Sequence, residues 1–303
     1  MRVLIIGLGS IAKKHIAALK EIYPDVKLFA MRSSPLAPEV EGVINIYESD
    51  NVRNLGLDFV IISNPTFKHK ETIESLLHLN LPLFIEKPIF NTLEGEDLLN
   101  SIAKKKIITY VACNLRFLEC LKFAKRSIVD KRLNEVNIYC GSYLPVWRPG
   151  QNFRETYSAN QEMGGGVHID LIHELDYAYW IFGSPKNIRR TTSSSSSLDI
   201  SAIDYANYLL QFDQYNVSII LNYFRRDAKR TLEVVCDDGT LNIDLLKNEV
   251  FWNGDLVFKS KQLVSDTYTG QMKFFIENIL TQKDSLNTAN EAYAILKICL
   301  AKG

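Results

Sequence analysis

The first 115 residues alternate short apolar runs with segments of helical periodicity, and this alternation constrains the fold more than any other feature. The runs VLII, VKLFAM, LDFVII, LPLFI and IITYVAC are each short enough to be one buried strand. Between them lie helical patterns, such as residues 93–106. Because short links between strand and helix favour parallel neighbours, the pattern predicts a doubly wound parallel sheet of the Rossmann type.

A glycine-rich turn follows the first apolar run, with the spacing Gly7-x-Gly9-x-x-Ala12. The first glycine permits a tight turn, the second lets the backbone approach a pyrophosphate, and the small Ala12 lets the helix lie close to the strand. Ser10 and Ile11 would then begin a helix whose free N–H groups face the phosphates. The motif alone is weak and also fits a purely structural turn, but its strand–helix context favours a dinucleotide site.

The second apolar run ends at Met31 and is followed by Arg32, Ser33 and Ser34. An NAD site usually has an acidic residue here, which binds the ribose hydroxyls. A guanidinium and two hydroxyls suit a 2′-phosphate instead. The sequence therefore favours NADP, with NAD as a possible cofactor; the alternative is that Arg32 is an ordinary surface residue.

Further polar residues follow the later strands. They are Ser63-Asn64-Pro65, Glu86-Lys87-Pro88 and Asn114. Since the carboxyl ends of parallel strands meet at one sheet edge, where ligands bind in this fold, these residues should gather around one nucleotide. Lys87 is expected beside that nucleotide.

From residue 116 onward the pattern changes. Helical segments are expected at 117–131 and 165–182, and strands at 134–147, 187–197, 204–213, 216–224, 229–236, 239–244 and 248–258. The sequence predicts a Rossmann domain at 1–115 and an α+β domain with a large, open, mostly antiparallel sheet at 116–303. Two final helices, 265–282 and 288–301, could pack back on the first domain.

The segment GGGVHIDLIHELD, residues 164–176, combines histidines with acids. On a regular helix Asp170 and His173 lie about 60° apart and share a face, whereas His168 lies about 140° from His173. That spacing is poor for a metal site unless His168 precedes the helix proper. An aspartate can instead orient a histidine that exchanges a proton with substrate. The alternative is a pair that only caps or packs the helix.

Charge and cysteine content exclude several classes of protein. Lys plus Arg equals Asp plus Glu, each 35, so no global field favours nucleic acid or an anionic membrane. No apolar stretch approaches the roughly 20 residues of a membrane helix, and the first residues do not resemble a signal peptide. Five cysteines without C-x-x-C spacing are expected to be reduced and buried. We therefore expect a cytoplasmic protein.

Together, Gly7–Ala12, Ser63-Asn64-Pro65 with His69, Glu86-Lys87-Pro88, the Asn114/Arg116 strand end and GGGVHIDLIHELDYAYWIFG resemble the glucose–fructose oxidoreductase/inositol dehydrogenase (Gfo/Idh/MocA) family over nearly the whole chain. The resemblance implies NAD(P)-dependent oxidation or reduction of a sugar or cyclitol carbon. It implies catalytic roles for Lys87, Asp170 and His173, and a homodimer or homotetramer formed through the open sheet. The family's commoner Asp-x-x-x-His spacing is Asp-x-x-His here, so His173 and Lys87 are both candidates for the proton acceptor.

The segment DLIHELDY, together with NLRF and YLPVWRPG, resembles a subgroup linked to the synthesis of bacterial surface sugars, which implies a sugar, sugar acid or nucleotide-sugar substrate. Polar and aromatic side chains suited to such a ligand are Arg116, Trp147, Arg148, Arg154, Tyr157 and His168. The position of the segment LPVWRPGQNFRETY just before the glycine-rich helix favours a substrate loop, and the alternative for each is an ordinary surface residue. Two rival functions remain: a non-catalytic NADP-sensing regulator of the same fold, and a metal-dependent hydrolase.

Overall fold

The structure is a computed structural model that describes residues 1–32 and 34–302. The chain divides into two compact units. Unit 1 comprises Met1–Asn114 and Val264–Leu296, and unit 2 comprises Leu115–Leu263 with the end of the chain from Lys297.

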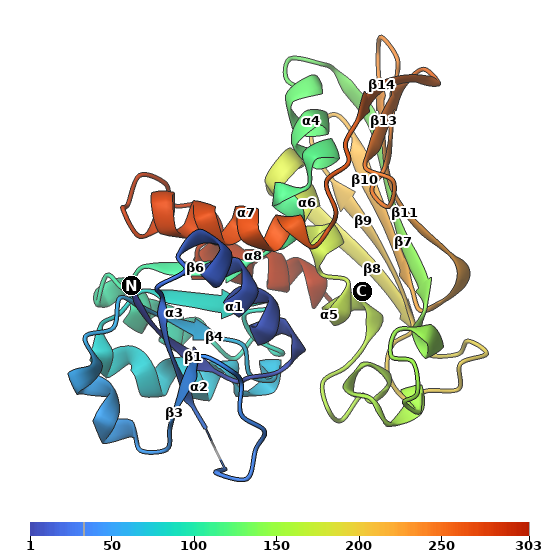
Figure 1. Cartoon of the computed structure of the whole chain (residues 1–303). Coiled ribbons are helices and arrows are strands. Elements are labelled where there is room, and N and C mark those ends of the chain that lie inside the picture. The colour runs from blue at the N-terminus through green and yellow to red at the C-terminus, as the bar shows by residue number, and fades with distance from the viewer. Residues whose placement is uncertain (33, 303) are drawn as a thin grey trace. The chain divides into compact units, whose positions relative to one another are not determined.

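Unit 1 contains a six-stranded sheet in the order β3-β2-β1-β4-β5-β6, and all its pairings are parallel (Figure 1). The strands are β1 (Arg2–Ile6), β2 (Lys27–Met31), β3 (Val43–Ile46), β4 (Phe59–Ile62), β5 (Leu83–Glu86) and β6 (Thr109–Ala112). Helices α1 (Ser10–Ile22), α2 (His69–Leu76) and α3 (Glu96–Lys104) follow β1, β4 and β5. The predicted doubly wound parallel sheet is therefore confirmed.

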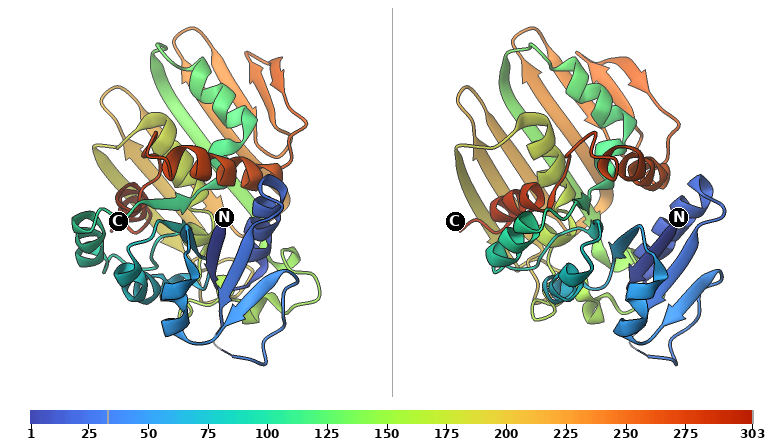
Figure 2. Two further views of the ribbon diagram at one scale, coloured as in Figure 1. Left: turned by 60° about the vertical axis from the view of Figure 1, so that its left-hand side comes forward. Right: turned by 90° about the vertical axis from the view of Figure 1, so that its left-hand side faces the viewer.

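The last two helices complete the core of unit 1. Helix α7 (Asp266–Phe274) continues as a π-helical turn, Phe275–Ile279, and α8 (Ala289–Cys299) follows. The Phe275 ring packs edge-on against Phe59 and Phe84, at centroid distances of 5.0 and 5.2 Å. Figure 2 shows α7 beside α1, so residues from both ends of the chain share one core.

Unit 2 contains an eight-stranded sheet in the order β14-β13-β12-β11-β7-β10-β9-β8. The strands are β7 (Leu133–Tyr143), β8 (Asn187–Ser193), β9 (Tyr205–Gln211), β10 (Asn216–Asn222), β11 (Phe224–Cys236), β12 (Thr240–Asp244), β13 (Glu249–Trp252) and β14 (Asp255–Lys259). Every pairing is antiparallel except that of β7 with β10. This confirms the predicted large, mostly antiparallel sheet.

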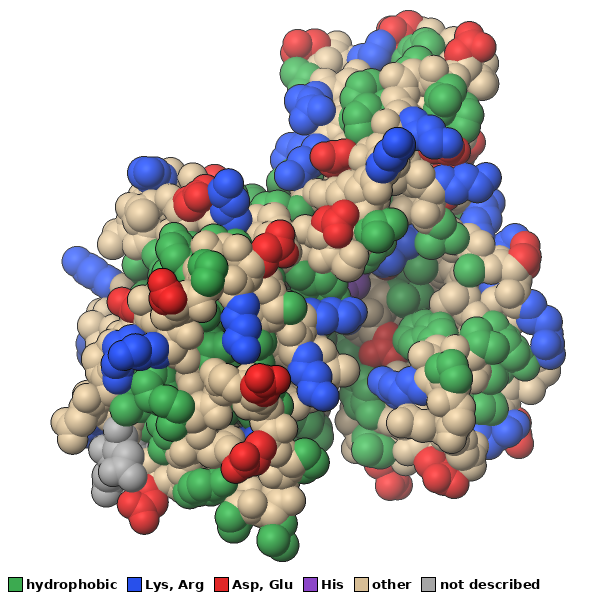
Figure 3. All heavy atoms as spheres, viewed as in Figure 1, with side chains coloured by type: hydrophobic (Ala, Val, Ile, Leu, Met, Phe, Trp, Pro, Cys, Tyr) green, Lys and Arg blue, Asp and Glu red, His purple; other side chains and the backbone are tan. Residues whose placement is uncertain are grey.

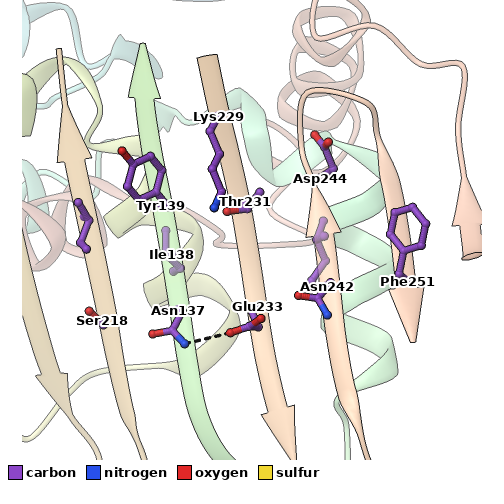
Figure 4. Close-up of a pocket in the computed structure, with 12 residues that line it drawn as sticks. Asn137, Ile138, Tyr139, Ser218, Lys229, Thr231, Glu233, Asn242, Asp244 and Phe251 are labelled. Atoms are coloured by element: carbon purple, nitrogen blue, oxygen red, sulfur yellow. Dashed lines mark hydrogen bonds between the residues drawn. The ribbon is translucent and has the colours of Figure 1, made fainter. Parts of the chain in front are cut away.

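The two faces of this sheet differ as the alternation of its residues requires. Ile138 and Leu232 are buried on the face covered by α4 (Glu119–Ser127), α5 (Val167–Asp170) and α6 (His173–Phe182). Asn137, Tyr139 and Glu233 lie on the opposite, open face, where Asn137 Nδ2 donates to Glu233 Oε1 at 3.1 Å (Figure 4).

Several predicted elements differ in detail. Strand β3 was not predicted, because its apolar run is only four residues long and is interrupted by Asn45. The expected strand 248–258 is two strands, β13 and β14, which turn at Asn253 and Gly254, both with positive φ. The expected helix 165–182 is interrupted at residues 171–172, where Ile172 and Glu174 donate their N–H groups three residues back instead of four.

No described helix is long and apolar enough to cross a membrane. All five cysteines are buried, and the described residues form no disulfide. Basic and acidic side chains are interspersed over the face shown in Figure 3, in keeping with the zero net charge.

Candidate functional site

The glycine turn after β1 depends on close contact with the end of β4. Gly7 has φ +90°, and a Cβ built on it would lie 2.6 Å from Asn64 Cα. Ser63 Oγ donates to the Gly7 carbonyl at 2.9 Å and fixes the same contact. Only glycine fits this position without displacing backbone.

The second glycine is different, because a Cβ on Gly9 would meet no atom within 4 Å. Gly9 is the N-cap of α1 and offers no side-chain cap, and no acid lies in the first turn. The helix instead has Lys13 near its start, and Ala12 is fully buried against the sheet. Uncapped N–H groups with a nearby cation make this a helix start that fits an anion such as a pyrophosphate.

A cavity of about 580 Å³ lies at this edge of the parallel sheet. It is lined by Ile6, Gly7, Leu8, Lys13, Met31, Arg32, Ala37, Pro38, Glu39, Val40, Asn64, Pro65 and Lys68. Four of the residues predicted to bind the cofactor, Gly7, Arg32, Asn64 and Pro65, meet here from the ends of three strands. The lining that the structure describes does not include Gly9–Ala12, Glu86, Lys87 or Asn114, whose contacts with a dinucleotide stay predictions.

Three residues predicted to bind the cofactor follow β2. Arg32 lines the cavity and donates to Asn45 Oδ1 at 3.3 Å and to the Pro38 carbonyl at 3.0 Å. Ser34 Oγ accepts the Leu36 N–H at 3.2 Å. Ser33 lies outside the described residues.

His69 connects the segment after β4 to the segment after β5. It is buried, its Nε2 lies 3.0 Å from the Asn64 carbonyl, and its Nδ1 lies 3.1 Å from the Pro88 carbonyl. Burial lowers the pKa of His69 below its usual value, so the neutral ring is favoured. The expected contact of His69 with the cofactor stays a prediction.

The Glu86-Lys87 motif lies at the carboxyl end of β5. Glu86 is buried, its Oε1 lies 2.5 Å from His15 Nε2 on α1, and its Oε2 accepts the Lys87 N–H at 3.1 Å. At the end of β6, Asn114 is also buried, and its Nδ2 donates to Thr267 Oγ1 at 2.7 Å. Contacts of Glu86 and Asn114 with the cofactor stay predictions.

In unit 2, Asp170 is held by two tyrosines. The Tyr223 hydroxyl donates to Asp170 Oδ2 at 2.5 Å, and the Tyr157 hydroxyl also bonds to Asp170. Burial and then the Asp170 charge raise the pKa of both phenols, so both are donors at neutral pH. Because the helix is interrupted after Asp170, the regular-helix angle between Asp170 and His173 does not apply.

Other predicted substrate residues lie near this group. Trp147 packs edge-on against Tyr223 with 5.3 Å between centroids, and its Nε1 donates to Ser142 Oγ at 3.0 Å. The exposed Arg148 is close enough to lower the pKa of Tyr157 slightly, against the larger effect of burial. Arg154 donates to the Leu198 carbonyl at 2.9 Å. Sequence reasoning missed Tyr223, because an aromatic residue at a strand end is normally interpreted as core.

Arg116 and His168 are buried within unit 2. The Arg116 guanidinium is 1 % exposed and binds Asp176 through two hydrogen bonds, of 2.9 and 2.7 Å. This side chain is engaged inside the fold, which argues against the substrate contact predicted for it. Burial, followed by the charge of Arg190, lowers the pKa of His168 to about 4, so its ring is neutral at pH 7.

No group of three or more histidine, cysteine, aspartate or glutamate side chains that could hold a metal ion occurs in residues 1–32 and 34–302. The segment 164–176 therefore offers no such group among the described residues.

Comparison with known proteins supports the family resemblance found in the sequence. Residues 1–113 match the oxidoreductase family with an NAD-binding Rossmann fold, GFO_IDH_MocA, and residues 122–242 match the C-terminal domain of that family. The scyllo-inositol 2-dehydrogenase (NAD(+)) of Bacillus subtilis is 27% identical over 99% of this chain and 92% of its own.

Solved structures share the fold. The myo-inositol 2-dehydrogenase of Lactobacillus plantarum superposes with a TM-score of 0.79 at 22% identity, over 99% of this chain and 95% of its own. The WlbA dehydrogenase of Bordetella pertussis, solved with NADH and UDP-GlcNAcA, gives 0.78 at 15% identity, over 98% and 93%. With both family domains matched and both sheets present, this chain belongs to the Gfo/Idh/MocA family of oxidoreductases.

Proposed function

We propose that this protein is an NADP-dependent oxidoreductase that interconverts a hydroxyl and a keto group on a sugar, sugar acid or nucleotide sugar. The observation that carries the proposal is the cavity at the glycine turn, at the same edge of the parallel sheet as Lys87. When bound there, the cofactor would supply or accept the hydride.

The preference for NADP rests on charge. The cavity lining includes three cations, Lys13, Arg32 and Lys68, and one acid, Glu39. The residues after β2 include no carboxylate in 31–34 that could bind both ribose hydroxyls. An added phosphate would gain charge-assisted hydrogen bonds in such surroundings. NAD remains the alternative cofactor.

Three residues are proposed as catalytic. His173 would accept the proton of the substrate hydroxyl, and Asp170 would stabilise the imidazolium that forms. Lys87 would stabilise the negative charge that develops on the substrate oxygen. In the reverse direction the same groups return the proton.

The substrate class is inferred from unit 2 and from relatives. Trp147 and Tyr157 offer aromatic faces and a hydroxyl near Asp170, and Arg148 offers an exposed cation for a carboxylate or phosphate. Two relatives that match along nearly the whole chain are named as inositol dehydrogenases. The WlbA dehydrogenase, which shares the fold, was solved with the nucleotide sugar UDP-GlcNAcA. Together these observations support a sugar, sugar acid or nucleotide sugar as the substrate class.

We also propose that two or four copies associate through the open face of the unit 2 sheet, in the cytoplasm. That face has a shallow pocket with a volume of about 520 Å³, and Tyr139, Ile220 and Phe251 are among the residues that line it. Buried cysteines that form no disulfide among the described residues suit a reducing compartment. Light scattering of wild type and Phe251→Glu tests the assembly, and an unchanged mass for the variant would argue against this face.

The function is tested by mixing purified protein with NADP or NAD and a panel of sugars, sugar acids and nucleotide sugars, and following NADPH absorbance. Lys87→Ala and His173→Ala should each lower kcat on the order of 10² to 10⁴-fold. Near-full turnover in both variants, with cofactor still bound, would contradict the catalytic assignment. Tight cofactor binding without turnover of any substrate would favour the regulatory alternative.

A further inference from the structure

The carboxylate before Lys87 is held by a histidine of the cofactor helix. His15 is 0 % exposed, and its Nε2 lies 2.5 Å from Glu86 Oε1. The other carboxylate oxygen, Oε2, accepts the backbone N–H of Lys87 at 3.1 Å. A chain of hydrogen bonds therefore runs from α1, through Glu86, to the main chain of Lys87.

The surroundings of His15 fix its ring and its role as donor. Its ring packs edge-on against Phe84 and Tyr268, at centroid distances of 4.9 and 5.9 Å. Its Nδ1 is buried and has no hydrogen-bond partner among the described residues. A carboxylate accepts only, so the hydrogen on His15 must be on Nε2. Packing and hydrogen bonding together leave Glu86 one orientation.

We propose that His15 is a positioning residue for Lys87. By fixing the Glu86 carboxylate, His15 fixes the peptide from which the Lys87 side chain projects, at the end of β5. Since α1 also forms the glycine turn, one buried hydrogen bond ties the catalytic lysine to the helix that holds the cofactor. The inference rests on the proposed catalytic role of Lys87.

The geometry suggests a size for the effect. Small misplacement of a reacting group costs up to about 10²-fold in rate, because catalysis depends on near-attack geometry. His15→Leu removes the donor, whereas the amide of His15→Gln can reach the position of Nε2. The shorter amide of His15→Asn is polar but cannot reach Glu86.

The experiment measures kcat, substrate KM, the cofactor Kd by fluorescence and the unfolding midpoint for these variants. We expect His15→Leu to lower kcat about 10- to 100-fold with KM and Kd within about threefold. His15→Gln should restore kcat to within about threefold of wild type. His78→Leu, at an exposed histidine of the same unit, is the matched control. If His15→Leu does not fold, the comparison of His15→Asn with His15→Gln replaces it.

A double-mutant cycle with Lys87→Ala separates positioning from general structure. If His15 acts through Lys87, His15→Leu has little further effect on kcat in the Lys87→Ala background. An equal loss in both backgrounds, or full activity of His15→Leu while Lys87→Ala is impaired, overturns the inference alone. Full activity of Lys87→Ala by itself overturns the proposed function, and this inference with it.

Discussion

The Tyr223 hydroxyl donates a hydrogen bond of 2.5 Å to Asp170, and so joins the end of β10 to the end of α5. The ring of Trp147 packs against the same tyrosine. The aspartate proposed to be catalytic is thus anchored by the sheet of unit 2 and not solely by its own helix.

Removing this phenol should therefore impair catalysis. We expect Tyr223→Phe to lower kcat on the order of tenfold or more, because a hydrogen bond to a charged group contributes about 1.5 to 3 kcal/mol. Steady-state kinetics measures the effect, and Tyr215→Phe, at a tyrosine stacked on Phe212, serves as the control. Unchanged kcat would show that Asp170 does not need this donor.

The two glycines of the turn should respond differently to a methyl group. Gly7→Ala should lower the free energy of unfolding by about 1 to 3 kcal/mol, because of positive φ and the contact with Asn64. Gly9→Ala should leave the free energy of unfolding within about 0.5 kcal/mol, because its Cβ would meet no protein atom within 4 Å. The same methyl group should weaken cofactor binding, because it would project into the space proposed for the pyrophosphate. Urea unfolding and cofactor titration distinguish the two. Equal stability loss in both variants would contradict this account of the turn.

Arg32 should determine the choice of cofactor. Arg32→Ala is expected to raise the Kd of NADP about 10- to 100-fold, through loss of charge-assisted hydrogen bonds, and to leave the Kd of NAD within about threefold. Arg189→Ala, at an exposed arginine of β8, is the control for net charge. Equal weakening of both cofactors would assign Arg32 a structural role.

The buried pair Arg116–Asp176 should matter for stability. Asp176→Ala is expected to lower the free energy of unfolding by about 3 to 5 kcal/mol, because it removes the carboxylate that neutralises a buried guanidinium. Asp227→Ala, which breaks the surface pair with Arg225, should cost no more than about 1 kcal/mol. Urea unfolding compares them. A stable Arg116→Ala protein with a raised substrate KM would restore the substrate role predicted from the sequence.

Stability should fall with acid because of His168. The pKa of His168 is lowered to about 4, so between pH 6.5 and 4 the unfolded chain binds a proton that the folded chain excludes. The free energy of unfolding should decline over this window, by at most about 3 kcal/mol from this residue, and level off below it. Urea unfolding at pH 7.5 and 4.5 measures the decline, and His168→Asn should reduce it. An equal decline in the variant would exclude His168 as the cause.

The parts that were predictable from sequence are those with strong local signals. Alternating apolar runs predicted the parallel sheet, and the spacing of Gly7, Gly9 and Ala12 predicted the turn that lines part of the cavity. Their spacing reflects backbone constraints that act within a few residues, so it can be recognised without the fold.

Other features depend on contacts between distant residues. His15 and Glu86 are 71 positions apart, and Tyr223 and Asp170 are 53 apart, and no local pattern links them. Arg116 seemed suited to a ligand because a free guanidinium recognises anions, but its buried partner Asp176 is 60 residues away. The interruption of the helix at 171–172 was missed because wheel geometry assumes one unbroken helix.

The start of α1 has no side-chain cap and has Lys13 in place of an acid, so the stability of the fold should depend on the anion that binds there. An anion bound there would accept hydrogen bonds from the free N–H groups of the first turn. Because only the folded chain offers these groups together, binding would raise the free energy of unfolding. At a ligand concentration 100 times its Kd this gain is about 2.7 kcal/mol. The lifetime of this chain in a cell, where proteases remove unfolded molecules, would then follow the supply of its cofactor.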